Sequence, residues 1–303
     1  MSYNVTSLPA YVEQHNSELL YQVVFGGNTI RRMAKQTGVK GTSTINLLSA
    51  DLPFQSGDGC GFTPQGEAKF TQRQIVTGRI KVDTEFCPDD LIGKYNEYLV
   101  RVNANQTALP FEQEIMDAIV DGIRAKMEKA VWQGDTASSD ANLKHFDGLL
   151  KLIGSASGVN KVSIDAGTSA YDAIKAVYMA IPEHLLSKNN VKINVSPAIY
   201  REFLLAMVEK NYFHYSGAQN EYPTEFIFPG TNVAVALAEG LAGSNNIVAS
   251  QDSNLVYGCD MEGDMEDLKL WFSDDNDVFR LKGKWNAGVN VAFPDEVVLG
   301  TIA

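Results

Sequence analysis

The stretch that decides the fold runs from Pro110 to Leu150 and reads PFEQEIMDAIVDGIRAKMEKAVWQGDTASSDANLKHFDGLL. Within it, apolar side chains recur at every fourth residue, which places them on one face of a helix over 110–133. The stripe consists of Ile115, Ile119, Ile123, Met127 and Val131. Acidic residues gather in the first turns and basic residues in the last, as the helix dipole favours, and Gly134 supplies the stop. At 1.5 Å per residue this helix is about 36 Å long. We expect a strut.

Upstream of this helix, the pattern from Thr42 to Phe86 is that of β-structure. In its last part Ile80, Val82 and Phe86 alternate with charged residues, the period of two of a half-solvated strand. Glycines and a proline interrupt the middle of the segment. This tip contains Gly57, Gly59, Gly61, Pro64 and Gly66, and Lys69 follows it. The sequence therefore predicts one long hairpin with a flexible tip.

The remaining segments complete an α+β chain. Residues 1–35 mix short apolar and polar pieces and end in a basic cluster, so we expect an arm. The region 156–258 alternates amphipathic helices with short buried strands, which predicts an α/β sandwich. The last residues read as a hairpin followed by a further strand.

Composition narrows the class of function. The chain has 303 residues and a formal net charge of −12, which repels phosphate and disfavours sequence-specific nucleic-acid binding. Its three cysteines, Cys60, Cys87 and Cys259, lie far apart and indicate a reducing compartment. No run approaches the roughly 18 apolar residues of a spanning helix. We expect a protein made in the cytosol that uses no membrane.

Catalytic motifs do not emerge. The sequence contains no GxSxG, HExxH or P-loop pattern. One acidic alternation, Asp260, Glu262, Asp264 and Glu266, would share a face in an extended strand and could hold a hard cation. The alternative is a solvated strand face or loop, because no glycine turn of calcium-binding type accompanies it. A metal-dependent enzyme that uses this acidic row is therefore one hypothesis for the function.

The order of elements resembles the major capsid protein of tailed phages, the Hong Kong 97-type fold. The resemblance rests on Trp132, Gly134, Asp135 and the segment Phe146–Leu150, and on the closing GKWNAGVNVAFPDEVV of 283–298. It implies an N-terminal arm (1–38), an extended hairpin called the E-loop (39–90), and a P domain with the long spine helix (91–155). An A domain (156–258) follows, and then the closing β segment of the P domain with a return strand (259–303).

This resemblance implies a structural role without active site or cofactor. Subunits would form the pentamers and hexamers of an icosahedral shell that encloses the genome of a tailed phage or prophage, without sequence-specific DNA binding. The E-loop tip (Gly57, Gly59, Gly61, Pro64, Gly66, Lys69) would contact a neighbouring subunit. Because the chain begins directly with the arm, we expect a separate scaffolding protein, together with a portal. The location would be the virion capsid, assembled in the host cytoplasm.

Two points remain open within the resemblance. The shell proteins of encapsulin nanocompartments are similar in fold but tend to begin with a helix that meets cargo, so a polar N-terminal arm favours the phage reading. Some family members join an E-loop lysine to an asparagine of a neighbour. Lys69 is the candidate lysine, but no partner asparagine or assisting glutamate can be assigned, and a plain surface lysine is the alternative.

Overall fold

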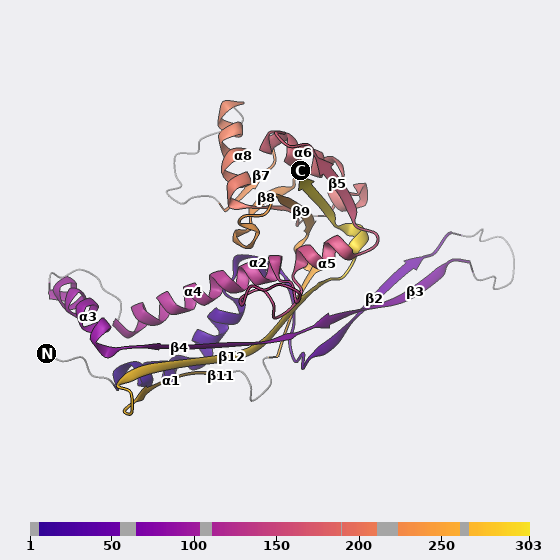
Figure 1. The fold of residues 1–303 in the computed structure, drawn as a ribbon. Coiled ribbons are helices and arrows are strands. Elements are labelled where there is room, and N and C mark those ends of the chain that lie inside the picture. Colours follow the sequence, from indigo (N-terminus) through magenta and orange to yellow (C-terminus); the bar gives the residue numbers. More distant parts are fainter. Residues whose placement is uncertain (1–5, 55–64, 104–110, 189, 211–223, 261–266) are drawn as a thin grey trace.

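The computed structural model describes residues 6–54, 65–103, 111–188, 190–210, 224–260 and 267–303. The fold is α+β and has two lobes joined side by side, with a two-stranded hairpin extending from the body (Figure 1). The first lobe is elongated and holds the strut helix. The second lobe is built on a separate sheet and contains the C-terminus.

A five-stranded sheet forms the frame of the elongated lobe. Its order is β1-β10-β12-β11, and β4 pairs with β12 as well. The strands are β1 (Ala34–Gln36), β4 (Gly78–Phe86), β10 (Leu255–Cys259), β11 (Asp267–Ser273) and β12 (Val278–Val291). Because β12 is 14 residues long, it runs the length of the lobe and pairs antiparallel with three strands.

Helices cover one face of this sheet. The helices of this lobe are α1 (Ser7–Phe25), α2 (Asn28–Arg32), α3 (Pro88–Asn103), α4 (Phe111–Gln133) and α5 (Leu149–Ser155), of which α1 packs on β11 and α5 on β12. The predicted long helix is confirmed as α4, which begins one residue after Pro110, but it is part of the main core and not only a strut. Its buried side chains join those of α1 and the inner face of β12 in one core, where Trp132, Trp285 and Phe279 are almost fully enclosed.

The N-terminal segment differs from the expected arm. Ser7–Phe25 forms α1, which packs on α4 and β11 of its own chain and buries Leu8, Val12 and Val23. A kink at His15 interrupts it. The reason is hydrophobic spacing: Leu8, Val12, Leu19 and Val23 recur at intervals of four and seven, which is a helical stripe that burial rewards.

The hairpin consists of β2 (Thr42–Asp51) and β3 (Glu67–Val76), paired in register over all ten residues. The prediction that the hairpin continues to Phe86 is wrong, because β4 leaves it and pairs with β12. The alternation seen in β4 is confirmed, with Ile80 buried and Lys81 exposed. Alternation identifies a strand's buried face, but it does not identify the strand's partner.

The second lobe is a six-stranded sheet of order β5-β13-β9-β6-β8-β7. Its strands are β5 (Asn160–Ile164), β6 (Val191–Val195), β7 (Glu225–Ile227), β8 (Ala234–Leu237), β9 (Asn246–Gln251) and β13 (Val298–Ile302). Its helices and 3-10 turns are α6 (Ala170–Met179), α7 (Glu183–Leu186), α8 (Pro197–Glu209), η1 (Glu239–Leu241), η2 (Asp252–Asn254) and η3 (Pro294–Glu296). Ser196 caps α8 and accepts a hydrogen bond from the Ile199 amide.

The loop between α4 and α5 closes on itself. The Gly148 amide donates to the Gly134 carbonyl at 2.8 Å, and Asp135 and Leu143 form a second backbone bond. A Cβ on Gly148 would lie 2.5 Å from the Gly134 nitrogen, so only glycine permits this crossing. Lys151 Nζ then binds both Asp135 and Asp147 at 2.7 Å. The loop that looks loose in sequence is therefore tied at both ends.

Candidate assembly surfaces

The described residues offer no metal centre. Among them, no three His, Cys, Asp or Glu side chains converge to hold an ion. Of the acidic row, Asp260 is buried just beyond β10, whereas Glu262, Asp264 and Glu266 lie outside the described residues. No helix in the described part of the chain is long and apolar enough to cross a membrane.

The structure places the predicted stripe residues of α4 at different depths. Ile123, Met127 and Val131 are buried, and Trp132 beyond them is fully enclosed. Ile115 and Ile119 are only partly buried, because they face a cleft near the start of the helix.

Of the tip residues, Gly66 alone has a described conformation. It adopts a positive φ of 91°, which suits glycine at the start of β3. Gly57, Gly59, Gly61 and Pro64 lie outside the described residues. Lys69 belongs to β3 and pairs with Ser49 in the backbone register, so it lies on the strand beyond the tip.

The hairpin presents a face without charge to solvent. On this face the side chains of Thr42, Thr44, Asn46 and Leu48 lie opposite those of Val76, Gln74, Gln72 and Phe70. Leu48 is 58% exposed and Phe70 is 79% exposed, and Leu52 and Phe54 just beyond β2 are exposed too. Exposed hairpins normally carry charges that block edge-to-edge association and aggregation. An uncharged, partly apolar face of this length is typical of a surface that another molecule covers.

A second surface is the outer face of β4, β12 and β11, opposite the helices. We call it the basic sheet face, and it consists of Arg79, Lys81, Lys269, Arg280, Lys282 and Lys284, with Asp83, Glu85, Asp267 and Trp271 among them. Lys81, Asp83, Trp271 and Arg280 help to line a groove of about 670 Å³. Six cations against three acids are an unusual local excess in a chain of net charge −12.

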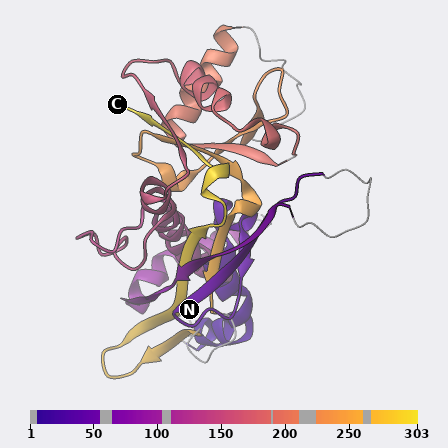
Figure 2. The ribbon, with the colours of Figure 1, turned by 90° about the vertical axis from the view of Figure 1, so that its right-hand side faces the viewer.

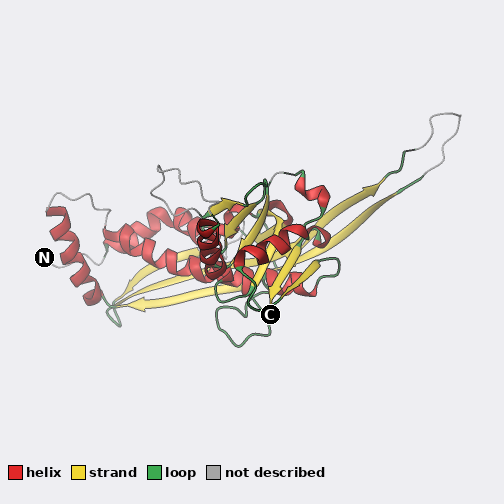
Figure 3. Cartoon of the chain, turned by 90° about the horizontal axis from the view of Figure 1, so that it is seen from above, coloured by secondary structure: helices red, strands yellow, loops and turns green. Residues whose placement is uncertain are grey.

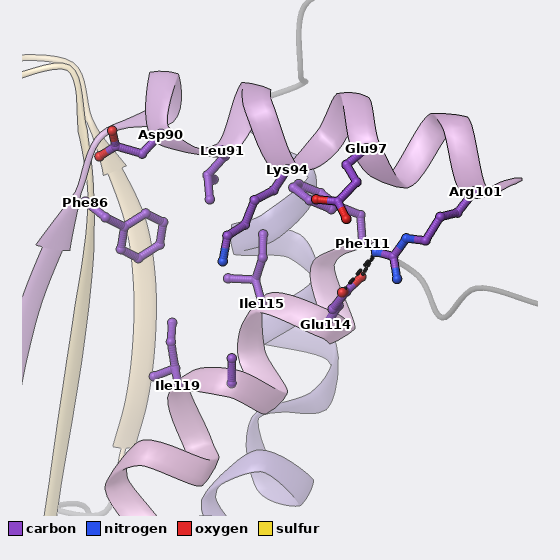
Figure 4. Close-up of a pocket in the computed structure, with 11 residues that line it drawn as sticks. Phe86, Asp90, Leu91, Lys94, Glu97, Arg101, Phe111, Glu114, Ile115 and Ile119 are labelled. Carbon is purple, nitrogen blue, oxygen red and sulfur yellow. Dashed lines mark hydrogen bonds and ion pairs between the residues drawn. The ribbon is translucent and has the colours of Figure 1, made fainter.

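A third surface is the cleft between α3 and the start of α4, shown in Figure 4. Its volume is about 480 Å³. Phe86, Leu91, Phe111, Ile115 and Ile119 give it an apolar lining. The charged residues that line it are Asp90, Lys94, Glu97 and the ion pair of Arg101 with Glu114, whose atoms lie 2.8 Å apart. We call this surface the α3–α4 cleft.

A buried carboxyl lies where α2, α4 and the second lobe meet. Glu128 of α4 accepts a hydrogen bond from the Thr29 amide at 3.0 Å, and Thr29 Oγ1 accepts one from Trp132 Nε1. Burial raises the pKa of the Glu128 carboxyl, while its hydrogen bonds from Thr29 and the charge of Arg32 oppose that shift. Glu128 Oε2 has no hydrogen-bond partner in the structure. Burial therefore disfavours the ionised form of the Glu128 carboxyl.

Arg32 also connects the lobes. It approaches Glu225 and Asp252, which Lys192 binds at 2.7 and 3.1 Å, and it donates to Asn194 of β6. This network fastens α2 to the sheet of the second lobe. Sequence reasoning missed these residues, because they are isolated charges on different elements and only the tertiary fold brings them together.

The comparisons with known proteins find similarity in structure but not in sequence. No family model matches the sequence, and no curated protein matches it significantly. A chain of the satellite phage P4 procapsid including the size determination (Sid) protein is 12% identical, with a TM-score of 0.64, over 97% of this chain and 95% of that chain. The capsid of an empty GTA particle matches at 11% identity and a TM-score of 0.58, over 90% and 88% of the two chains.

An archaeal shell is similar as well. A virus-like particle from Pyrococcus furiosus matches at 12% identity and a TM-score of 0.53, over 95% of this chain and 98% of that chain. These likenesses extend over nearly the whole length of the chain, through both lobes. The chain therefore has the fold of capsid and virus-like-particle shell proteins.

Proposed function

We propose that this chain is the major capsid protein of a tailed phage or prophage, of the Hong Kong 97 type. In this role it assembles with copies of itself, as pentamers and hexamers, into an icosahedral shell around DNA. The observation that carries the proposal is the match over 97% of the chain to a procapsid chain. The exposed uncharged face of the hairpin supports it, because a monomer gains nothing from leaving Leu48 and Phe70 in water.

The proposal assigns a part to each region. The hairpin of β2 and β3 is the E-loop, α4 is the spine helix of the P domain, and the second lobe is the A domain. The protein has no catalytic role, and its shell encloses DNA without sequence-specific binding. A separate scaffolding protein and a portal complete the particle, which assembles in the host cytoplasm.

An encapsulin-type shell is the second candidate. Two observations favour it: the match to the virus-like particle from Pyrococcus furiosus, and the N-terminal helix α1 in place of a polar arm. The two candidates differ in what the shell contains. Particles purified from the native source should hold nuclease-protected DNA if the chain is a phage capsid protein, and a protein cargo if it is an encapsulin.

The assembly proposal is tested by shortening the hairpin. Replacing Gln55–Gly66 with an Asn-Gly turn keeps a hairpin connection, so the far-UV circular dichroism and the melting transition of the subunit should stay close to those of the parent. Sedimentation and electron microscopy should show closed shells for the parent and absent or fragile shells for the variant. A parent that stays monomeric at micromolar concentration refutes the shell proposal, and normal shells from the variant refute the role of the hairpin.

A further inference from the structure

A pocket of about 280 Å³ lies between α4, the strands β4 and β12, and the loop that joins α4 to α5. The helix runs lengthwise beside the strands of the elongated lobe (Figures 1 and 3), and the loop lies on the side of the molecule away from the hairpin (Figure 2). We call this hollow the α4–loop pocket. Its apolar lining consists of Ile80, Val82, Ile123, Met127, Ala130 and Trp285.

Backbone contacts hold the walls of this pocket in place. Trp285 and Ile80 stand opposite each other in the register of β12 and β4, and both are buried. The loop backbone lies directly against β4, because a Cβ on Gly78 would clash with the His145 carbonyl oxygen. The loop is also tied at its base by a backbone hydrogen bond. The pocket is therefore formed before any ligand arrives, as in most small-molecule sites.

One residue of the lining carries a hydrogen-bond donor without an acceptor. Trp285 is 2% exposed, and its Nε1 has no hydrogen-bond partner among the described residues. Trp132 is buried as deeply, but its Nε1 donates to Thr29 Oγ1 at 2.9 Å. The indole N–H can only donate, and a buried donor without an acceptor costs free energy. An occupant with an acceptor atom would remove this cost.

The rim of the pocket carries one cation without a counter-charge. The polar lining residues are Lys81, Asp83, Lys126, Asn142 and His145. Lys81 and Asp83 form an ion pair, and the Asn142 amide group donates within its own loop. Lys126 of α4 is exposed and forms no ion pair within the described part of the chain. Its long stem allows the ammonium to fold over the pocket. Two donors, the Trp285 N–H and the Lys126 ammonium, therefore fit an anionic acceptor.

The size of the pocket limits what can fill it. A volume of about 280 Å³ has room for about ten non-hydrogen atoms, at about 30 Å³ for each water-sized atom. Water itself is a poor occupant, because a buried water needs about two to four polar partners and most of the walls are apolar. An anionic occupant must therefore be small and mostly apolar.

We propose that the α4–loop pocket binds a small apolar carboxylate with a single hydrocarbon chain or ring. The hydrocarbon part packs against Ile123, Met127 and Trp285, and the carboxylate oxygens accept hydrogen bonds from Trp285 Nε1 and the Lys126 ammonium. A carboxylate that is paired and hydrogen-bonded in this way avoids the cost of an isolated buried charge. Because the ligand contacts the helix, both strands and the loop at once, it stabilises the folded subunit. This site does not depend on the shell function.

Titration of the full chain with octanoate tests the site. Octanoate matches the expected size and charge, whereas octanol has the same chain without the charge and octylamine reverses the charge. Isothermal titration calorimetry should show one octanoate site per subunit, and octanoate should raise the melting temperature. Octanol should bind about tenfold more weakly and octylamine more weakly still, because the charge-assisted hydrogen bonds are lost. If octanoate does not bind, or if octanol or octylamine binds as tightly, the proposal is wrong.

Two substitutions locate the binding. Trp285→Phe keeps an aromatic ring but removes the N–H, and Lys126→Gln removes the charge at the rim. Each should weaken octanoate binding about tenfold. Lys129→Gln, an exposed change on the same helix outside the pocket, is the matched control and should bind octanoate like the parent. Because Lys126 is exposed, Lys126→Gln stays folded and can be measured even if Trp285→Phe is destabilised. If either folded variant binds octanoate as tightly as the parent, the pocket assignment is wrong and the shell function still stands.

Discussion

The helix α4 and the hairpin of β2 and β3 are both long, but their apolar residues lie in opposite environments. In α4 the side chains of Met116, Val131 and Trp132 are fully buried against the chain's own core. In the hairpin Leu48 and Phe70 lie in solvent, although each could have been polar without loss to the subunit. The helix therefore stabilises the subunit, whereas the hairpin's apolar face is available to an assembly. Substitutions in the two elements should separate folding from association.

The largest effect on folding is expected in the helix. Ile123 is 8% exposed, so Ile123→Asp places an unpaired charge in the core and should cost about 3–5 kcal/mol. We expect little or no soluble folded protein. Lys126→Glu, an exposed change on the same helix, is the control and should stay within about 0.5 kcal/mol of the parent. A parent-like melting temperature for Ile123→Asp would contradict the burial of this face.

The buried carboxyl of Glu128 predicts a smaller effect that depends on pH. Burial raises the folded-state pKa of Glu128 above its unfolded value, so its contribution to stability is greatest below the unfolded pKa and is lost as pH rises through the folded pKa. Glu128→Gln removes this titration and can still accept the Thr29 amide bond.

Denaturant unfolding at about pH 5 and about pH 8 checks the sign. Glu128→Gln should gain about 1 kcal/mol relative to the parent at the higher pH, and less at the lower. Glu202→Gln, an exposed change on α8, is the control and should show no such trend. A gain that shrinks as pH rises would mean that the charged form of Glu128 is stabilised by Arg32 rather than penalised by burial.

A substitution at Gly122 in the same helix should stabilise the subunit, and by a still smaller free energy. A Cβ on Gly122 would meet nothing within 4 Å, so Gly122→Ala should stabilise by about 0.5–1 kcal/mol through helix propensity. The opposite sign is expected for Gly240→Ala, whose Cβ would lie 2.1 Å from the Glu128 carbonyl oxygen. Thermal unfolding of the two variants measures both signs, and a destabilised Gly122→Ala would show that this side of α4 is covered.

The smallest effect on the subunit is expected in the hairpin. Leu48→Ser and Phe70→Ser each remove an exposed apolar side chain, so the unfolding free energy should change by no more than about 0.5 kcal/mol. If either variant loses several kcal/mol in the monomer, the hairpin face is part of the subunit core and the contrast with α4 disappears.

The sequence was most informative where one local period decides the structure. The stripe from Ile115 to Val131 predicted α4 to within a residue, and alternation predicted which residues of β4 are buried. It failed where pairing is non-local: nothing in the segment 78–86 indicates that β12, about two hundred residues later, is its partner. The helix α1 was missed although Leu8, Val12 and Leu19 carried its signal.

The candidate surfaces were less predictable than the fold. The charges of the basic sheet face come from three strands, and only their register brings Lys81 opposite Lys284. The hairpin tip was expected to be the contact region from its glycines, and this stays a prediction because 55–64 lie outside the described residues; among the hairpin residues that are described, Leu48, Phe54 and Phe70 are exposed apolar side chains. Glycine content reports backbone freedom, but the exposed side chains beside it carry the information about partners.

The closed loop between α4 and α5 also has a practical consequence. The hydrogen bond between Gly134 and Gly148 holds the two ends of this loop together. Extra residues near Ser139 would therefore lengthen the loop while its two ends stay in place. The helices on either side would not have to move. A foreign peptide inserted between Ser139 and Asp140 should therefore leave the two helices and the fold of the subunit in place.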